Sequence, residues 1–538
     1  MSQYPKINNY SPEKERGRDF LGQQATIQAL TGVCLPTFTN STAILRYYSF
    51  WPWAFKMLVE HGSKLEGIKR NRYLWKLETA LNIANRMRDP DYKGMPGVQG
   101  VKFPDIEAPD DLEVVIDYEK NDRTSAYSPV QYSPSLTTLR IVARRGKDRP
   151  LDKYGKTLAK IFDDYIKQFE GYSRLVDPDS RSLSMGHLRN LMPALSLENV
   201  LKEEQNCFLE VIEQNEVNVG LKNGMTPRIQ TTRMLLDIIR TQKAKPSEDT
   251  IAPIWDGSYE APEILKSITH AWRIVRGRQF FQRSLESQLS AFLLFIDDTM
   301  EPGNTLVEFS ETLFERLGRG ELLGFTMLEF DTHLGGSQSF GELCDYLYKF
   351  CKSNNIDEDT IESAIKERPV SKSHAYQYNL SSEIGVLGLL LQILLFRRTE
   401  ELGRGVDEMG QSFLNHPPGY KLSFTTFAKV MERCMQMPAR DGLYELLSET
   451  MLLLHLGVAQ EKWAQMGNFT FRFVRADDGG YVRHIGSSIN DPNATGNKLW
   501  AYISLLRYLG FWEYGEDDVM VLTQTGRDYL AQAVPLND

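Results

Sequence analysis

Hydrophobic residues recur at three- and four-residue spacing along most of the chain, and this period predicts α-helices. The pattern is most regular from about residue 180 to residue 465, where the intervening linkers are rich in Gly and Pro. Residues 37–62 differ because they are apolar on nearly every side, which is typical of a helix surrounded by other helices. We therefore expect a mainly α protein with a multi-helical body in which residues 37–62 contain a central core helix.

Two cations and one proline interrupt this core helix. Arg46 and Lys56 argue against a membrane span and must find buried partners or reach water. Pro52 predicts a kink. A second helix follows over residues 63–89, with Ser63 as its cap and a stop before Pro90.

Residues 91–136 are rich in Gly, Pro, Asp and Ser, which predicts a long irregular segment with one short strand at 113–118. The C-terminal pattern changes again. Residues 469–485 read FTFRFVRADDGGYVRHI, two alternating runs around a turn, which is typical of a β-hairpin. Then come a helix at 497–509, a strand–turn–strand segment and a last helix from Thr525, and this order resembles bacterial winged-helix domains.

These patterns divide the chain into four consecutive parts. Residues 1–20 read as a flexible polar arm, and residues 21–175 as an N-terminal helical region with an irregular basic insertion. Residues 176–466 form the helical body, and residues 467–538 form the hairpin with a small winged-helix-like α+β domain.

Composition limits the possible binding partners and the cellular compartment. The net charge of −9 excludes a chain-wide basic field, so nucleic-acid binding requires a local patch. Five widely spaced cysteines indicate no disulfide framework and fit a reducing compartment. The N-terminus lacks the apolar core of a signal peptide, and the apolar run 384–396 is too short to span a bilayer. We expect a cytoplasmic protein.

Two local basic runs supply candidate patches. From Arg46 to Asp89 there are nine basic residues against four acidic ones, and from Arg140 to Lys160 there are eight against two. Solvated helix faces explain such runs without any ligand, but phosphate-backbone contact explains them too, with Tyr73, Trp75 and Tyr154 as stacking candidates. The predicted nucleic-acid-binding residues are Arg70, Arg72, Lys76, Arg144, Arg145 and Lys147. Arg273, Arg276 and Arg283 form a weaker third candidate.

Motifs for catalysis and cofactors are missing. There is no phosphate-binding loop, dinucleotide fingerprint, serine nucleophile motif or metal-ligand spacing, so we predict no catalytic residue, no metal and no cofactor. Cys344 and Cys351 are expected to be small core residues, and His455 a hydrogen-bonded core histidine. One enzymatic alternative remains, a cryptic metal-dependent nuclease with a site assembled from Asp297, Asp298 and Asp331.

The winged-helix-like segment raises a further alternative, a DNA-binding regulator. From Gly486 to Asp538, however, three basic residues stand against seven acidic ones, and the turn Glu516-Asp517-Asp518 would repel a phosphate backbone. Arg472, Arg475 and Arg483 in the preceding hairpin keep DNA binding open. Protein docking is the better interpretation of this segment.

The string LTGVCLPTFTNSTAILRYYSFWPWAF (residues 30–55) carries a family resemblance. A Pro-containing turn, Thr39-Asn40 and then an Arg-Tyr-Tyr-x-Phe-x-x-Trp helix resemble bacterial proteins encoded in anti-phage defence islands, and among named systems an accessory subunit of Druantia. The resemblance implies partners from the same operon, including a large helicase-like protein, and it carries over no catalytic residues. We therefore expect a non-enzymatic component of a multi-protein antiviral defence system, a scaffold with local nucleic-acid contacts and a docking C-terminal domain.

Overall fold

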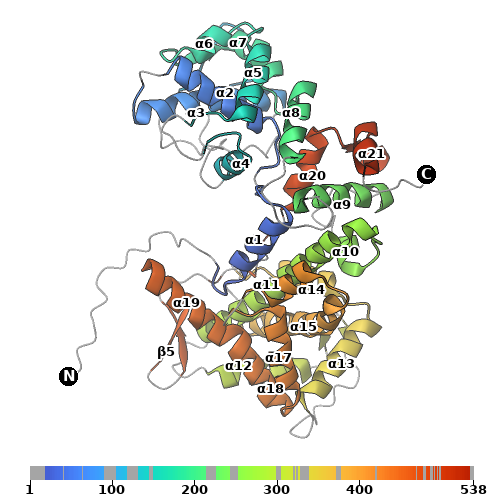
Figure 1. The fold of residues 1–538 in the computed structure, drawn as a ribbon. Helices are drawn as coiled ribbons and strands as arrows, with labels where there is room; N and C mark the ends of the chain where they lie inside the picture. Colours follow the sequence, from blue (N-terminus) through green and yellow to red (C-terminus); the bar gives the residue numbers. More distant parts are fainter. Residues whose placement is uncertain are drawn as a thin grey trace, which may run out of the picture. The chain divides into compact units, whose positions relative to one another are not determined.

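The computed structural model shows a mainly α-helical protein with a few short strands, as the periodicity predicted (Figure 1). The structure describes residues 19–39, 42–62, 65–89, 104–117, 131–143, 149–213, 226–242, 252–298, 305–318, 321–322, 325–326, 339–370, 377–417, 421–467, 469–476, 480–484, 489, 491–492, 495 and 498–532. Residues 1–18 of the predicted arm lie outside this set.

The chain forms two compact units that interleave along the sequence. The first unit comprises Met1–Thr31 and Thr269–Gly496, and the second comprises Gly32–Ile268 and Asn497–Asp538. The four-part division expected from the sequence follows chain order, whereas these units each join segments far apart in the chain. Two of the boundaries between the units fall within the residue ranges of helices α1 (Gln23–Cys34) and α11 (Lys266–Asp298).

The first unit is a helical body built on α11 and α15 (Gln377–Gly403), whose buried side chains include Phe292 and Leu390. Helix α15 contacts α12, α13, α14 and α17. The other elements of this unit are α12 (Leu306–Gly318), β3 (Glu321–Leu322), β4 (Phe325–Thr326), α13 (Phe340–Ser353), α14 (Glu358–Lys366), α16 (Glu408–Asn415), α17 (Phe424–Met435), α18 (Ala439–Leu447), η5 (Ser448–Leu452), α19 (Leu453–Met466), β5 (Phe473–Arg475) and β6 (Tyr481–Arg483).

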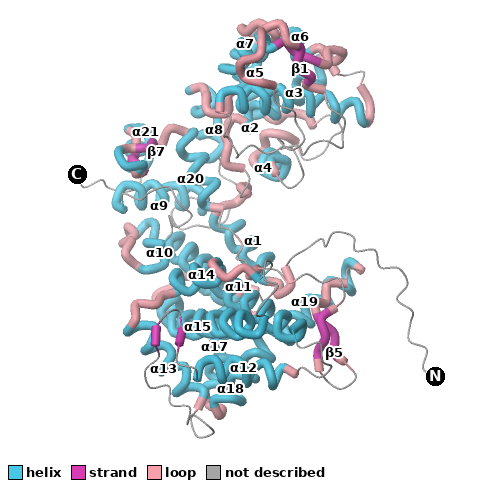
Figure 2. Tube along the Cα trace, turned by 180° about the vertical axis from the view of Figure 1, so that it is seen from behind, coloured by secondary structure: helices cyan, strands magenta, loops and turns pink. Residues whose placement is uncertain are grey.

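The second unit packs helices around α2 (Tyr47–Glu60), which contacts α5 most extensively, and Figure 2 shows these helices from behind. Its other elements are α3 (Ile68–Arg88), β1 (Glu113–Val115), α4 (Tyr132–Thr138), α5 (Lys153–Ile166), α6 (Tyr172–Val176), β2 (Ser182–Ser184), α7 (Met185–Leu195), α8 (Lys202–Glu213), α9 (Pro227–Gln242), α10 (Ala252–Asp256), η3 (Glu263–Leu265), α20 (Leu499–Tyr508), β7 (Trp512–Tyr514), η6 (Glu516–Asp518), β8 (Met520–Leu522) and α21 (Gln524–Ala531).

The expected core helix is confirmed in α2, and its cations have the partners they need. Arg46, immediately before the helix, is fully buried, pairs with Glu204 and donates a 2.7 Å hydrogen bond to the Ala194 carbonyl. Its guanidinium lies 4.5 Å from the centre of the Phe162 ring. Lys56 Nζ lies 2.6 Å from an Asp163 carboxylate oxygen. Both cations of this region are therefore paired with carboxylates, Arg46 with Glu204 and Lys56 with Asp163.

The helix after α2 was predicted to begin at Ser63, and this start was wrong. Helix α3 begins at Ile68 because Gly67, with a φ of 53°, turns the chain out of helical geometry just before it. The predicted strand near 113–118 is confirmed as β1, which pairs antiparallel with the distant β2. The segment predicted to be irregular also contains α4, which begins at Tyr132.

The C-terminal strands are short and local. The predicted hairpin at 469–485 is confirmed, because β5 and β6 pair antiparallel with Val474 opposite Val482. A second antiparallel pair, β7 and β8, lies between α20 and α21. Gly526 lets α21 lie close to the residue before β7, since a Cβ there would lie 2.0 Å from the Phe511 carbonyl oxygen.

Helix α15 includes the one described segment, Asn379–Gly403, that is long and apolar enough to cross a membrane, yet 78% of its apolar window is buried inside the protein. This is expected of a core helix in a soluble protein.

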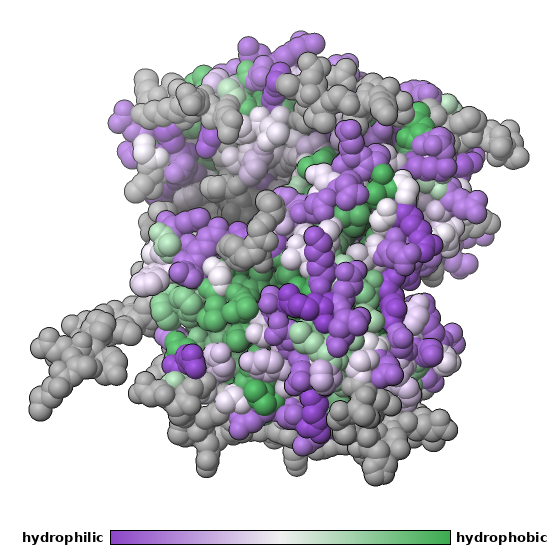
Figure 3. Space-filling model, turned by 60° about the horizontal axis from the view of Figure 1, so that its bottom comes forward, coloured by the Kyte–Doolittle hydropathy of each residue, from purple (hydrophilic) through white to green (hydrophobic). Residues whose placement is uncertain are grey.

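The view in Figure 3 shows hydrophobic residues grouped on one face among hydrophilic ones. Exposed apolar side chains of the first unit include Leu453, Trp463, Val474 and Val482.

His455 is confirmed as a hydrogen-bonded core histidine. Its Nδ1 lies 3.2 Å from the Phe20 carbonyl, and its Nε2 accepts a 3.1 Å hydrogen bond from the Arg472 backbone N–H. These two bonds require the neutral ring, and burial lowers the pKa of His455 to about 4. Cys344 and Cys351 are also buried, as expected, and burial raises the pKa of each thiol to about 12.

Candidate nucleic-acid interface

Most of the first basic run lies on α3, and two of its predicted site residues, Arg72 and Lys76, are bound by groups of the protein itself. Lys76 is 2% exposed and its ammonium donates to the Asp177 carbonyl. Burial lowers the pKa of Lys76 to about 8. The Arg72 guanidinium, which is half-buried, lies 2.5 Å from an Asp117 carboxylate oxygen. Arg70 is half-buried as well. Their role as nucleic-acid contacts stays a prediction, but Lys76 and Arg72 are already held by the protein itself.

The second basic run includes Arg144, Arg145 and Lys147, which lie outside the described residues. The two ends of their segment are described and held together. The Ala143 N–H donates a 2.9 Å hydrogen bond to the Pro150 carbonyl, and Val142 bridges Leu151 in antiparallel fashion. The described residues on either side of this segment therefore lie next to each other, directly before α5.

Helix α5 follows from a clear local pattern. The Asp152 side chain caps it by accepting a 2.9 Å hydrogen bond from the Lys153 N–H. Apolar residues at three- and four-residue spacing, Leu158, Phe162 and Ile166, are fully buried against neighbouring helices. Gly155 lets the helix lie against the preceding loop, because a Cβ there would lie 2.0 Å from the Ile141 carbonyl oxygen. The apolar face of the helix is therefore packed against the protein, and its opposite face is exposed.

That open face carries the remaining lysines of the second basic run. Lys153, Lys156 and Lys160 are exposed and, at spacings of three and four, share one face of the helix. None of the three forms an ion pair within the described part of the chain. Lys167, one helical repeat further, pairs with Asp164. We call Lys153, Lys156 and Lys160 the α5 lysine stripe.

Sequence reasoning counted these three lysines but did not place them among the site residues. The signal that could have found them is their spacing, which alternates with Leu158 and Phe162 and so puts the cations opposite the apolar face. In α3 the cations instead occupy several faces of a helix that is buried more widely.

The predicted stacking aromatics are not displayed beside the stripe. Tyr73 is buried, and its hydroxyl donates a 2.8 Å hydrogen bond to the Val176 carbonyl. Tyr154 is half-buried, with the Lys153 ammonium 5.2 Å from its ring centre. Trp75 is also half-buried. The stripe is therefore a row of ammonium groups without an exposed aromatic ring among the described residues of α5.

Asp163, three residues after Lys160 and so on the same side of the helix, anchors α5 to its neighbours. It accepts hydrogen bonds from the Trp53 indole at 3.0 Å, from Lys56 at 2.6 Å and from the Tyr172 hydroxyl at 2.7 Å. Burial alone would raise the pKa of Asp163, but these donors lower it below its ordinary value. A fully satisfied carboxylate of this kind positions the helix.

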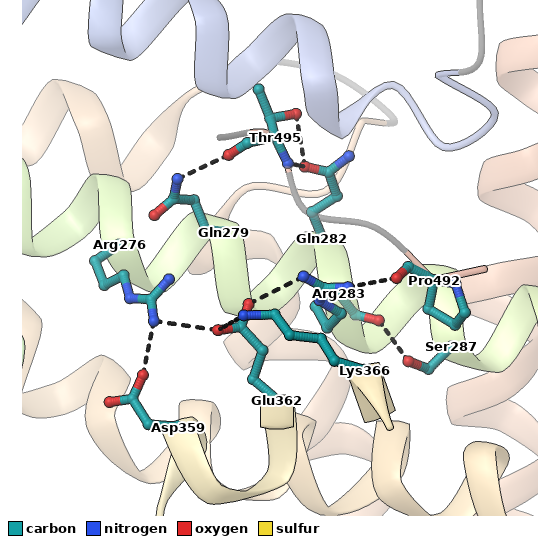
Figure 4. Close-up of polar contacts among 10 residues, drawn as sticks. All are labelled: Arg276, Gln279, Gln282, Arg283, Ser287, Asp359, Glu362, Lys366, Pro492 and Thr495. Carbon is teal, nitrogen blue, oxygen red and sulfur yellow. Dashed lines mark hydrogen bonds and ion pairs between the residues drawn. The ribbon is translucent and has the colours of Figure 1, made fainter. Parts of the chain in front are cut away.

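The third basic candidate, on α11, is neutralised by carboxylates (Figure 4). Arg276 lies 2.6 Å from Asp359 and 3.2 Å from Glu362, and Arg283 lies 3.3 Å from Glu362. Burial would raise the pKa of Glu362, but Arg276 and Arg283 lower it. Arg273 pairs with Glu401 at 2.8 Å.

Two glutamines on the same helix hold a returning segment of chain (Figure 4). Gln279 Nε2 donates a 2.7 Å hydrogen bond to the Thr495 carbonyl, and Gln282 Oε1 accepts a 2.8 Å bond from the Thr495 N–H. Arg283 also donates to the Pro492 carbonyl. Because these polar groups bind one another, this cluster supports the fold of the first unit and leaves its arginines little charge to offer a phosphate.

The carboxylates considered for nuclease chemistry do not form a described site. Asp297 lies 2.9 Å from the Arg483 guanidinium, while the Asp298 side chain and Asp331 lie outside the described residues. Within the described residues there is no group of three or more His, Cys, Asp or Glu that could hold a metal ion.

Comparisons with known proteins add no relative. No family model, curated protein or solved structure matches this chain. A proposal for the function therefore starts from the residues and contacts of the chain and from the resemblance of residues 30–55.

Proposed function

We propose that this protein is a non-enzymatic component of a multi-protein bacterial anti-phage defence system that contacts nucleic acid through α5. The observation that carries the nucleic-acid contact is the α5 lysine stripe. Its three cations are exposed and form no ion pair among the described residues, although Asp164 lies close enough to Lys160 to interact with its charge, whereas Lys76 and Arg72 of α3 are engaged internally. Exposed cations without an ion pair, on a helix held in place, are groups that phosphate backbones bind.

The setting in phage defence rests on the resemblance of residues 30–55 to defence-island proteins, including the Arg46-Tyr47-Tyr48 start of α2. In this proposal the buried part of that motif is structural, because Arg46 pairs with Glu204 inside the core. The partners are other proteins of the same operon, with a large helicase-like protein among them.

We further propose that the C-terminal elements act as a winged-helix-like docking module for a protein partner. The chain order α20, β7, β8 and α21 supports this idea, and the charge of the turn between the strands argues against DNA. Glu516, Asp517 and Asp518 are all exposed there. Carboxylates at the position of a wing repel phosphates but can meet a basic protein surface.

The proposal is tested by measuring phage plaquing on cells that carry the native operon, with this gene intact, deleted, or carrying Lys153→Glu/Lys156→Glu/Lys160→Glu. We expect deletion to abolish protection. The triple variant should weaken protection, so that the efficiency of plaquing rises at least tenfold relative to cells with the intact gene. The matched control is Lys349→Glu/Lys352→Glu/Lys429→Glu, which makes the same charge change at exposed lysines of the first unit. Full protection without the gene would overturn the defence role, and equal effects of the two triple variants would overturn the α5 contact.

A second comparison asks whether the predicted residues before α5 contribute to binding in addition to the α5 lysine stripe. Arg144→Glu/Arg145→Glu/Lys147→Glu changes the three predicted residues that lie just before α5. If that variant also lowers nucleic-acid binding while the control does not, the interface extends from α5 to residues 144–147. If it has no effect, the contact is confined to the helix.

A further inference from the structure

The chemistry of the α5 stripe points to a particular class of nucleic acid. Nonspecific binders of single strands combine cations with exposed aromatic rings on which bases stack, and each stacked base contributes about 1–3 kcal/mol. The described outer face of α5 offers the cations without the rings. Tyr154 is half-buried and Phe162 is fully buried beneath the helix.

Lysine ammonium groups also carry little sequence information. They are compact point charges, whereas planar arginine guanidinium groups give the bidentate contacts that read guanine edges. The stripe contains only lysine. It is therefore suited to phosphate oxygens and not to base edges.

The length of the stripe matches the charge density of a duplex strand. Lys153 and Lys160 are seven residues apart, which corresponds to about 10 Å along an α-helix. One strand of B-form DNA carries a phosphate about every 3.4 Å of helix axis, so about 10 Å of that axis carries about three phosphates, the same number as the cations of the stripe. A rigid row of three cations is best paired with a rigid row of phosphates.

The helix is held well enough to act as such a rigid row. Asp163 accepts three hydrogen bonds from other elements, and Gly155 sets the helix directly against the Ile141 carbonyl. A single strand, which bends freely, gains no advantage from this rigidity, whereas a duplex presents its phosphates in a fixed order.

We infer that the α5 lysine stripe binds the phosphate backbone of double-stranded DNA without regard to base sequence. This inference rests on the proposed nucleic-acid contact and adds the substrate class. It assigns Lys153, Lys156 and Lys160 as backbone contacts, and it gives the half-buried Tyr154 no stacking role.

The test measures the affinity of the purified full-length protein by fluorescence anisotropy for a duplex and for one of its single strands, at several salt concentrations. We expect the duplex to bind about tenfold more tightly and two unrelated duplex sequences to bind equally. Lys153→Gln/Lys156→Gln/Lys160→Gln should weaken duplex binding roughly 100-fold at 0.1 M salt and lower the slope of log K against log salt by about 3. The control Lys349→Gln/Lys352→Gln/Lys429→Gln should leave both values unchanged.

The outcomes distinguish a failure of the duplex assignment from a failure of the proposed nucleic-acid contact. If the single strand binds more tightly and the triple variant still weakens binding, the duplex assignment is overturned and the α5 contact stands. If the protein binds nucleic acid but the triple variant binds like the control, both the α5 contact and the inference fail. If neither probe binds at 0.05 M salt, the nucleic-acid part of the proposed function fails. Tyr154→Leu should not change the duplex affinity, and a tenfold loss would contradict the absence of stacking.

Discussion

Helices α3 and α5 both arise from basic runs of similar net charge, yet they use their cations in opposite ways. In α3, Lys76 is buried on the Asp177 carbonyl and Arg72 pairs with Asp117. In α5, Lys153, Lys156 and Lys160 point away from a buried apolar face and pair with no carboxylate in the described structure. Basic runs of similar net charge thus give a structural helix in one place and a candidate binding surface in the other.

The difference shows that the position of a charge on its helix matters more than the number of charges. A lysine on the side of a helix that meets other elements must be desolvated and needs an acceptor there. A lysine opposite the apolar stripe stays in water and remains available for an external anion. The comparison between these two helices can be tested in four ways.

Reversing a buried cation of α3 should have the largest effect. Lys76→Glu would leave an uncompensated carboxylate against the Asp177 carbonyl, and we expect it to lower the free energy of unfolding by about 3–5 kcal/mol. The matched control is Lys69→Glu, an exposed position on the same helix, for which we expect a change within about 0.5 kcal/mol. Urea unfolding followed by tryptophan fluorescence measures both. Equal stability of the two variants would mean that Lys76 is not a structural cation.

The buried ammonium of Lys76 should also make stability depend on pH. Its pKa is lowered to about 8 in the folded protein and lies near 10.4 in an unfolded chain. Between these values the folded protein has released a proton that the unfolded chain still holds, so stability rises with pH. We expect the wild type to gain roughly 2–3 kcal/mol relative to Lys76→Met between pH 7.5 and 10. Parallel stability profiles for the two proteins would refute the shift.

The close contact between α5 and the preceding residues can be disturbed without changing the charges of the helix. Gly155→Ala would place a Cβ against the Ile141 carbonyl, and we expect it to cost about 1–3 kcal/mol of unfolding free energy and to weaken duplex binding by displacing the stripe. Gly403→Ala is the control, since no atom lies within 4 Å of a Cβ at that position. A Gly155→Ala protein with unchanged stability and binding would show that the close contact does not position the helix.

Reversing the α5 stripe should have the smallest effect on stability. Lys153→Glu/Lys156→Glu/Lys160→Glu replaces exposed side chains without ion-pair partners in the described structure, so we expect the free energy of unfolding to stay within about 0.5 kcal/mol per substitution. The measurement is the same urea titration as for Lys76→Glu. A loss comparable to that of Lys76→Glu would remove the distinction between the two helices.

Several local features could be predicted from the sequence because they depend on neighbours along the chain. The helical period gave the mainly α fold, the alternation around residues 477–480 gave the β5–β6 pair, and the apolar setting of His455 gave a core histidine. The start of α3 was missed because Gly67 overrode the Ser63 cap signal. The candidate site was predicted only in part, since the runs were identified but the exposed lysines were not separated from the engaged ones.

By itself, the sequence determined the positions of most helices, the amphipathic pattern of α5 and the presence of two basic runs, because periodicity and local charge are written in consecutive residues. Only the tertiary structure decided which carboxylates and carbonyls meet which cations. Asp117 lies 45 residues after Arg72, Asp177 lies 101 residues after Lys76, and Glu204 lies 158 residues after Arg46. Such partners are brought together by packing of distant elements, and the same packing leaves Lys153, Lys156 and Lys160 exposed together on one side of α5.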